Sequence, residues 1–226
     1  MSTFTPSNIK AIIFDYDLTL INSFHSAFEI YKYVEQELSS DTNITEEQLK
    51  SLWGATQAEI IRGLFGPDVD MDVVLNAILI ARKTVGKDMK LFDDTLETLN
   101  VLHKKFHLGI LTSATSSIVT YFSHQTGLPL ELFDVIQTTD DTTVYKPDPA
   151  VFDPIIERYE SQGIEKDQIV YVGDSPRDYI AARDADIHFF AVTTGLDNSE
   201  VFKSHGLDDP FILPRLQMLI SIFNEV

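Results

Sequence analysis

The stretch Ala11-Ile12-Ile13-Phe14-Asp15-Tyr16-Asp17 decides the fold, because a continuous apolar run is followed at once by two acidic residues. Such a short run is typical of a strand that is buried on both faces of a parallel sheet. Similar runs end at Thr112, at Gly173-Asp174 and at Thr193. Polar residues therefore follow the carboxyl ends of the predicted strands, where open α/β sheets bind ligands.

Helical patterns fill the intervals between these runs. Residues 95 to 105 carry leucines at a spacing of three, and Ser116 or Ser117 is placed to cap a helix that runs to Gln125. Because strand and helix alternate, the sequence predicts a doubly wound, Rossmann-like α/β fold with a parallel sheet.

Residues 22–88 differ from the rest of the chain, since they carry several helical patterns and no convincing strand. We expect a small helical domain here, inserted into an α/β core formed by residues 1–21 and 89–226. The chain crosses between the two near Ser23 and again near residues 88–93, which predicts a hinge.

The composition excludes several kinds of site and partner. The 226 residues include no Cys, which rules out disulfides, thiolate metal ligands and cysteine nucleophiles. Asp and Glu number 35 against 17 Lys and Arg, and this charge repels nucleic acid and anionic lipid. A solvated surface or an acidic interaction face both explain the acidity. The first six residues lack a secretory signal, so we predict a cytoplasmic protein without membrane partners, either a monomer or a homodimer.

Two groups of residues point to phosphoryl chemistry. Asp15 and Asp17 suit a reaction in which one carboxylate attacks and the other transfers a proton, although both also suit a simple turn after a strand. Thr112, Ser113 and Lys146 offer hydroxyl, N–H and ammonium donors, which the nonbridging oxygens of a phosphoryl group require. Taken alone, a Thr at a strand end is common and an isolated Lys is usually a surface charge, so Thr112 and Lys146 are each more often structural or surface residues.

A third group is acidic as well. Asp174 follows a predicted strand and Asp178 lies in the first turn of the next helix, where it can also simply complement the helix dipole. If these residues meet Asp15 and Asp17, each close pair of charges costs about 4 kcal/mol at an effective dielectric constant of 20. This crowding predicts a divalent cation, and all-oxygen ligands favour Mg²⁺.

The ordered series Asp15-x-Asp17, Thr112, Lys146 and Gly173-Asp174-x-x-x-Asp178 resembles the four motifs of the haloacid-dehalogenase superfamily. The resemblance spans roughly residues 10–195. By the position of its insertion, the chain is similar to the group with a helical cap between the first and second motifs. That group includes phosphoglycolate phosphatases, nucleotidases, pyrophosphatases and β-phosphoglucomutases.

The resemblance implies a catalytic role for each motif. Asp15 would attack phosphorus and form an aspartyl phosphate, while Asp17 would protonate the leaving oxygen and then activate water. Thr112 and Ser113 would bind phosphoryl oxygens, and Lys146 would balance charge at the nucleophile and the phosphate.

The resemblance also implies a Mg²⁺ site and a small phosphorylated metabolite as substrate. Asp174 would ligate the ion together with Asp15 and the carbonyl of Asp17. Asp178 would not contact the ion directly but would help to position its ligands.

The chain departs from the family pattern at three places. Leu18 replaces the usual Gly after the second Asp, and Phe92-Asp93-Asp94 replaces a usual Pro-Gly. Pro154 falls inside the helix expected after Lys146, which should kink or break that helix.

Candidate substrate-selecting residues come from the hinge and the cap. Asn22 and Ser23 lie at the hinge, and the segment with Trp53, Gly54 and Thr56 resembles the loop that enters the active site in related caps. Core packing is the alternative role for Trp53.

Other residues bear on the choice of reaction. Arg62 suits either a second anionic group or the surface. Ala27 stands where β-phosphoglucomutase has a histidine, and His25 is near the hinge but has no assigned role, so hydrolysis is favoured over phosphoryl return.

We therefore predict a phosphatase that resembles phosphoglycolate phosphatase, with a pyrophosphatase, a nucleotidase or a non-catalytic phosphoryl-binding protein as alternatives. A dehalogenase is disfavoured because that branch lacks the second Asp. A response-regulator receiver is disfavoured because it has neither the insertion nor the last motif.

Overall fold

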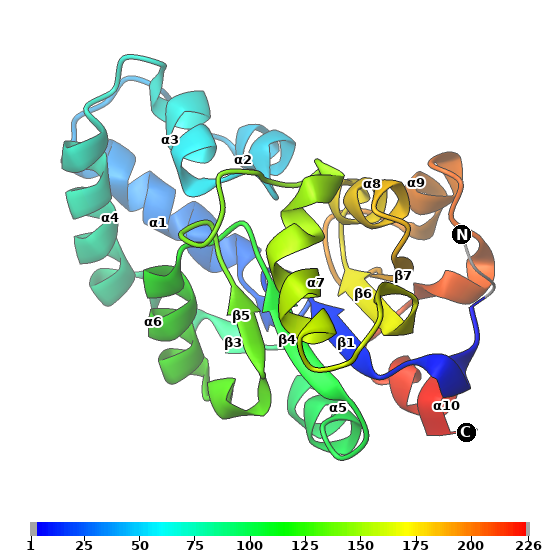
Figure 1. The fold of residues 1–226 in the computed structure, drawn as a ribbon. Helices are drawn as coiled ribbons and strands as arrows, with labels where there is room; N and C mark the ends of the chain where they lie inside the picture. Colours follow the sequence, from blue (N-terminus) through cyan, green and yellow to red (C-terminus); the bar gives the residue numbers. More distant parts are fainter. Residues whose placement is uncertain (1–3, 225–226) are drawn as a thin grey trace.

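A parallel six-stranded sheet forms the centre of the computed structural model, which describes residues 4–224 (Figure 1). The strands are β1 (Ala11–Phe14), β4 (His107–Leu111), β5 (Val135–Gln137), β6 (Ile169–Gly173), β7 (His188–Val192) and β8 (Ile212–Leu213). They are ordered β5-β4-β1-β6-β7-β8, and every neighbouring pair is parallel. The chain order reverses beside β1, and a crevice at such a switch point is where doubly wound sheets bind ligands.

Strand β1 is buried on both of its faces. Ile12 and Phe14 pack into one hydrophobic core, and Ala11 and Ile13 pack into the other. This division follows from the period of two along a strand. The apolar run in the sequence is therefore a central strand, as predicted.

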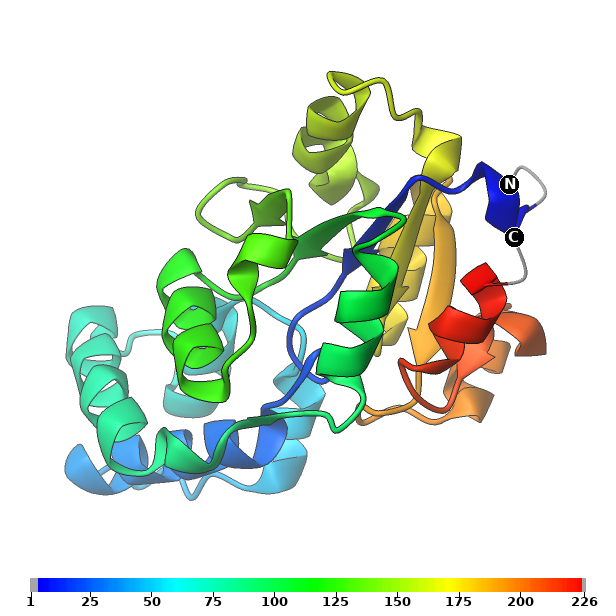
Figure 2. The same ribbon diagram turned by 90° about the horizontal axis from the view of Figure 1, so that it is seen from below.

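Helices cover both faces of the sheet (Figures 1 and 2). Helices α5 (Thr95–Leu102), α6 (Ser116–Thr126) and α10 (Met218–Asn224) contribute to the first core. Helices α7 (Asp153–Glu160), α8 (Pro176–Asp184) and α9 (Ser199–Ser204) contribute to the second core. The predicted doubly wound α/β fold is confirmed.

Four helices occupy the inserted segment: α1 (Phe24–Glu37), α2 (Glu46–Leu52), α3 (Gln57–Phe65) and α4 (Met71–Thr84). The segment is flanked by β2 (Ile21–Asn22) and β3 (Lys90–Leu91), which pair with each other in antiparallel fashion. The chain thus leaves and re-enters the core at adjacent positions. Figure 2 shows the helical group at one end of the molecule, beside α6. The domain bounds stay a prediction, and residues 1–3 and 225–226 of the predicted core lie outside the described residues.

Of two predictions about single helices, the structure contradicts the one about the cap of α6 and agrees with the one about Pro154. Thr115, rather than Ser116 or Ser117, caps α6, since its hydroxyl accepts a hydrogen bond from the N–H of Ile118. The helix expected after Lys146 is divided into a 3₁₀ turn and α7, and Pro154 lies in the first turn of α7. A proline is tolerated there because the first-turn N–H groups have no intrahelical partner.

Short 3₁₀ turns complete the connections. They span Pro6–Asn8, Gly86–Asp88, Leu130–Leu132, Pro149–Phe152, Lys166–Gln168 and Asp209–Phe211.

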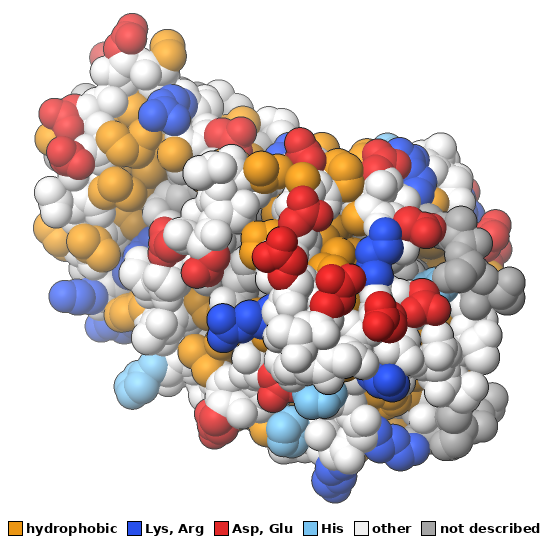
Figure 3. Space-filling model, in the orientation of Figure 1, with side chains coloured by type: hydrophobic (Ala, Val, Ile, Leu, Met, Phe, Trp, Pro, Cys, Tyr) orange, Lys and Arg blue, Asp and Glu red, His pale blue; other side chains and the backbone are white. Residues whose placement is uncertain are grey.

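The acidic residues are spread over the visible face and interspersed with Lys and Arg (Figure 3). On this face the mixture of charges is that of a solvated surface. Within residues 4–224, no helix has the length and apolar character needed to cross a membrane.

Candidate active site

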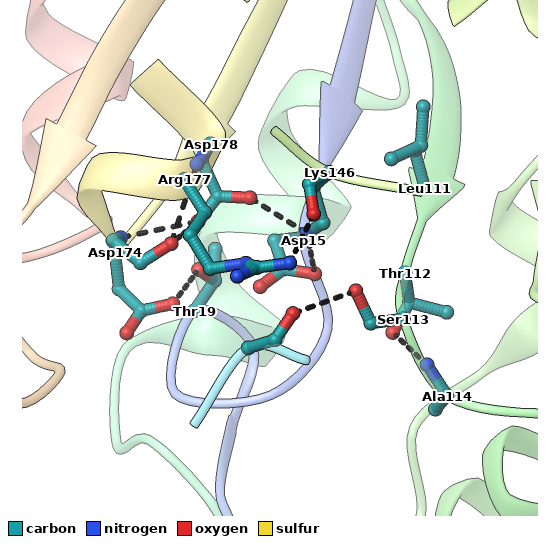
Figure 4. Close-up of polar contacts among 12 residues, drawn as sticks. Asp15, Thr19, Leu111, Thr112, Ser113, Ala114, Lys146, Asp174, Arg177 and Asp178 are labelled. Atoms are coloured by element: carbon teal, nitrogen blue, oxygen red, sulfur yellow. Dashed lines mark hydrogen bonds and ion pairs between the residues drawn. The ribbon is translucent and has the colours of Figure 1, made fainter. Parts of the chain in front are cut away.

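Asp15 and Lys146 form a buried ion pair at the carboxyl end of β1 (Figure 4). The Nζ of Lys146 donates to Oδ1 of Asp15 at 2.9 Å and to Oδ1 of Asp178 at 2.6 Å. It also donates to the Tyr171 hydroxyl at 3.0 Å, which in turn donates to Asp178. All three donors of the ammonium are thus used, so the cation is fixed between two carboxylates.

The pKa values of these acids diverge. Burial raises the pKa of Asp15 to about 7, and the charge of Asp178 adds to this effect against the opposing charge of Lys146. Burial also raises the pKa of Asp174 well above its ordinary value, with Asp178 and Asp15 contributing. Burial acts on Asp178 as well, but Lys146 and hydrogen bonds from Ser175 and Tyr171 keep its pKa below the ordinary value. Burial and the neighbouring carboxylates therefore both disfavour the charged forms of Asp15 and Asp174, and a bound cation would favour them.

The acidic residues fit a hard divalent cation. Carboxylate oxygens of Asp15, Asp174 and Asp178 lie within 4.8 Å of one another. The two oxygens of Asp178 are already occupied by Lys146, Tyr171 and Ser175, so Asp15 and Asp174 are better placed as direct ligands. In the described part of the chain, the Asp17 carboxylate is not a member of this cluster. Oxygen ligands of this kind suit Mg²⁺.

Thr112 and Ser113 follow β4 on the other side of Asp15 (Figure 4). The Thr112 hydroxyl accepts a hydrogen bond from the N–H of Ala114 at 3.1 Å. The Ser113 hydroxyl donates to the carbonyl of Gly54 at 3.0 Å and so joins the core to the helical segment.

A cavity of about 110 Å³ lies between the core and the helical segment. The predicted core residues that line it are Asp15, Asp17, Thr112, Ser113, Lys146 and Asp174. Burial raises the pKa of Asp17, whereas the Ser23 hydroxyl and the charges of Lys146 and Arg82 lower it. The four sequence motifs therefore meet at one edge of the sheet and face a shared space.

The predicted cap and hinge residues divide into two sets. Ser23, Trp53 and Gly54 line the cavity, and the Trp53 ring also packs edge-on against Phe24, with 5.0 Å between ring centroids. Asn22 and Thr56 are not among the lining residues. Asn22 is exposed in β2, and the Thr56 hydroxyl caps α3 by accepting from the N–H of Glu59.

Two residues near the site were missed by the sequence reasoning. Arg82 of α4 lines the cavity and is only 6% exposed, whereas Arg62, which was considered instead, is exposed. Gly195 lies against Asp174, because a Cβ on Gly195 would be 2.0 Å from Oδ2 of Asp174. The available signals were an arginine within an apolar helix and a glycine shortly after a strand.

Leu18 adopts the left-handed backbone conformation, with φ of 60°. Glycine adopts this conformation without strain, which explains why the family pattern has Gly there. The side chain of Leu18 is buried in the core, and its carbonyl accepts a hydrogen bond from Thr194 at 2.8 Å. The departure in sequence thus leaves the turn after Asp17 in the glycine-like conformation.

Comparison with known proteins agrees with this fold and site. Residues 12–192 match the family described as haloacid dehalogenase-like hydrolase. The chain therefore belongs to this family of hydrolytic enzymes, and the membership predicted from the motifs is confirmed.

Individual relatives are distant but cover nearly the whole chain. A phosphoglycolate phosphatase of Vibrio parahaemolyticus is 25% identical over 96% of this chain and 97% of its own length. A pyrophosphatase, PpaX of Bacillus pumilus, is 25% identical over 96% of this chain and 97% of its own length. A solved haloacid dehalogenase-like hydrolase from Streptococcus pneumoniae shares the fold with a TM-score of 0.73 at 20% identity, covering 96% of this chain and 99% of its own.

Proposed function

We propose that this chain is a Mg²⁺-dependent phosphatase that hydrolyses a small phosphorylated metabolite through a phosphate ester on Asp15. The observation that carries this proposal is the buried Lys146 ammonium, held between Asp15 and Asp178. It counters the repulsion that otherwise prevents a carboxylate from attacking a phosphate anion.

In the first half of the reaction, a carboxylate oxygen of Asp15 attacks phosphorus and the bond from phosphorus to the leaving oxygen breaks. Asp17 gives its proton to that oxygen, so the first product leaves as an alcohol or acid. The raised pKa of Asp17 favours the protonated form that this step requires. Thr112 and Ser113 position the phosphoryl oxygens.

In the second half, Asp17 accepts a proton from water, and the hydroxide oxygen attacks phosphorus. The bond between phosphorus and Asp15 breaks, which releases inorganic phosphate and restores the Asp15 carboxylate and the protonated form of Asp17. Mg²⁺, held by Asp15, the Asp17 carbonyl and Asp174 with Asp178 behind them, would supply positive charge to the phosphoryl oxygens.

Hydrolysis is favoured over phosphoryl return to a second sugar position. Ala27 lines the cavity at the position where a mutase would need a partner histidine, and no cavity-lining residue in the described range 4–224 is a histidine. We further propose that residues 22–88 act as a cap that closes over the substrate and excludes water.

The substrate is best sought among small phosphates. The similarity to a phosphoglycolate phosphatase and to a pyrophosphatase supports 2-phosphoglycolate and pyrophosphate as the first candidates. The cavity of about 110 Å³ is below the usual range for drug-sized ligands, which disfavours a nucleotide.

Phosphate release from a panel of phosphomonoesters, phosphoanhydrides and sugar phosphates tests this proposal, with Mg²⁺ present and after exhaustive chelation. We expect turnover of at least one small substrate, its loss on chelation and its return with Mg²⁺. Full activity after chelation would contradict the metal requirement. No turnover of any compound would favour the alternative of a phosphoryl-binding protein without catalysis.

A further inference from the structure

Arg82 is the one arginine that is buried among residues 4–224, and it lies at the cavity rather than in a packed core. It belongs to α4 of the helical segment and lines the cavity together with Asp15 and Asp17 of the core. Its backbone carbonyl accepts a hydrogen bond from Tyr121. Its guanidinium group makes no hydrogen bond or ion pair with any residue in the described range.

The arrangement is unfavourable for the free protein. A buried charge without a partner carries a large desolvation cost, and long charged side chains are rarely buried unless they are paired. The nearest compensation is the Phe122 ring, whose centroid is 5.9 Å from Cζ of Arg82. Burial lowers the pKa of Arg82, while Tyr31, Tyr121 and Asp17 oppose this effect. The guanidinium therefore has no hydrogen-bonded anion at this position, and the Asp17 carboxyl acts on it only through its charge.

We propose that Arg82 binds an anionic group on the leaving portion of the substrate, separate from the phosphoryl group that Asp15 attacks. The leaving portion would carry a carboxylate or a second phosphate, either of which a guanidinium can bind with two parallel hydrogen bonds. This inference rests on the proposed phosphatase function and specifies its substrate class: short phosphate compounds with a second negative charge.

The cavity wall favours a substrate in which a short linker without hydroxyl groups joins the two anionic groups. The Phe122 ring lies against Arg82, and the apolar side chains Ile30, Ile78 and Met89 also line the cavity. These four side chains offer no hydrogen-bond partners for the hydroxyl groups of a sugar. Tyr31 also lines the cavity, and burial raises the pKa of its hydroxyl, so it remains a neutral donor beside the guanidinium.

The kinetic test compares wild type with Arg82→Met, which keeps the bulk and removes the charge, and with Arg82→Lys, which keeps the charge. Substrates are 2-phosphoglycolate, pyrophosphate and ethyl phosphate, whose leaving group is uncharged. The measured quantity is the ratio of kcat/KM for each charged compound to kcat/KM for ethyl phosphate.

We expect Arg82→Met to lower this ratio by about 10- to 100-fold, the range for a lost hydrogen-bonded charge pair, and Arg82→Lys to recover part of it. A larger fall for 2-phosphoglycolate identifies the anion as a carboxylate, and a larger fall for pyrophosphate identifies it as a phosphate. The exposed Arg62 serves as the matched control, and Arg62→Met should leave the ratio unchanged. An equal fall for charged and uncharged substrates would overturn the inference, because Arg82 would then act through Asp17 or through folding.

A binding test separates this inference from the proposed catalysis. Trp53 is the single tryptophan and lines the cavity, so its fluorescence can follow titration of Asp15→Asn with 2-phosphoglycolate or pyrophosphate in the presence of Mg²⁺. We expect the Kd of one of them to rise about tenfold or more when Arg82→Met is added. If wild type hydrolyses nothing but this shift is found, the phosphatase proposal fails and the anion site stands. An unchanged Kd for both compounds would overturn the anion site.

The melting temperature distinguishes a substrate-binding role of Arg82 from a structural role. Replacing an unpaired buried charge by an apolar side chain is often neutral or stabilising, so Arg82→Met should melt at the wild-type temperature or above it. A markedly lower melting temperature, restored in Arg82→Lys, would assign Arg82 a structural role and overturn its role in substrate binding.

Discussion

At the scale of single residues, the site depends on a few close contacts that leave little freedom. Lys146 uses each of its three donors on a different side chain, and Asp178 has both oxygens engaged. Asp15 and Asp174 each accept one side-chain hydrogen bond, from Lys146 and Thr19, on Oδ1. Counting hydrogen bonds thus distinguishes Asp178 from Asp15 and Asp174. It favours Asp178 as a residue that positions Lys146, and the other two as direct metal ligands.

Gly195 provides a sharp test of this crowding. A methyl group at this position would lie 2.0 Å from Asp174 Oδ2 and 2.7 Å from Cγ, well inside van der Waals contact. Asp174 must then rotate away, so we predict that Gly195→Ala raises the Mg²⁺ concentration needed for half-maximal activity by at least about tenfold. The neighbouring exposed Leu196, changed to Ala, is the control. An unchanged Mg²⁺ requirement in Gly195→Ala would show that Asp174 does not hold the metal.

Leu18 shows how two energies compete at one position. Its left-handed backbone costs about 1–3 kcal/mol, which a glycine would recover. Removing a fully buried leucine side chain costs roughly 3–5 kcal/mol. Burial is the larger effect, so the chain can retain Leu where related sequences have Gly.

At the scale of elements, Glu35 ties the end of α1 to the chain that leads into α2. Its carboxylate accepts hydrogen bonds from the N–H of Ile44 at 2.6 Å and from Thr42 at 3.1 Å, and it pairs with Lys32. Burial opposes its charge, but these donors keep the pKa of Glu35 below its ordinary value of 4.5. Residues 38–45 contain no helix or strand, so this carboxylate organises the connection.

We predict that Glu35→Gln lowers the free energy of unfolding at neutral pH by about 1–3 kcal/mol. Because the folded pKa is the lower one, the contribution is complete above pH 4.5 and is lost as pH falls through the folded pKa. Urea unfolding at several pH values should therefore show the difference between wild type and variant shrinking in acid. The exposed Glu37, changed to Gln, should show neither effect. A difference that is constant with pH would contradict the role of the Glu35 charge.

At the scale of the whole molecule, Mg²⁺ should stabilise the fold because its ligands come from distant parts of the sequence. Asp15 and Asp174 belong to different strand ends, which meet only in the folded state. At 100 times its Kd, a ligand of the folded state adds about 2.7 kcal/mol. For a chain of this size we predict a rise in melting temperature of about 5–10 °C with saturating Mg²⁺.

Scanning calorimetry with and without Mg²⁺ checks this prediction, and Asp174→Asn is the matched variant. We expect the variant to lose most of the shift. An equal rise in both proteins would indicate nonspecific ion effects and would place the metal elsewhere.

The sequence predicted those features that are local or depend on strand ends. The apolar run before Asp15 revealed the central strand, and the four motifs lie at carboxyl ends that a parallel sheet must bring to one edge. Pro154 correctly marked a break in a helix, because its effect is also local.

The remaining features depend on contacts between elements. In the sequence, Arg82 cannot be distinguished from an ordinary helix residue. It is buried at the cavity only because α4 packs beside α1 and α6. Thr56 was a candidate for substrate contact, yet its hydroxyl caps a helix whose start the sequence reasoning did not identify. The site residues at strand ends could thus be predicted from the sequence. The site residues of the helical segment could not, because their positions depend on how its helices pack.

The most direct test of the Asp15 mechanism is the rate of phosphate release by wild type and by Asp15→Asn, measured side by side with Mg²⁺ on a substrate that the wild type hydrolyses. We predict that the variant loses at least about 1,000-fold in kcat, because the amide cannot form the phosphate ester. Its melting temperature without Mg²⁺ should stay near that of wild type, because burial raises the pKa of Asp15 to about 7 and ionisation of this carboxyl is then not expected to stabilise the folded state. A folded Asp15→Asn protein that retains turnover within about tenfold of wild type would contradict nucleophilic attack by Asp15.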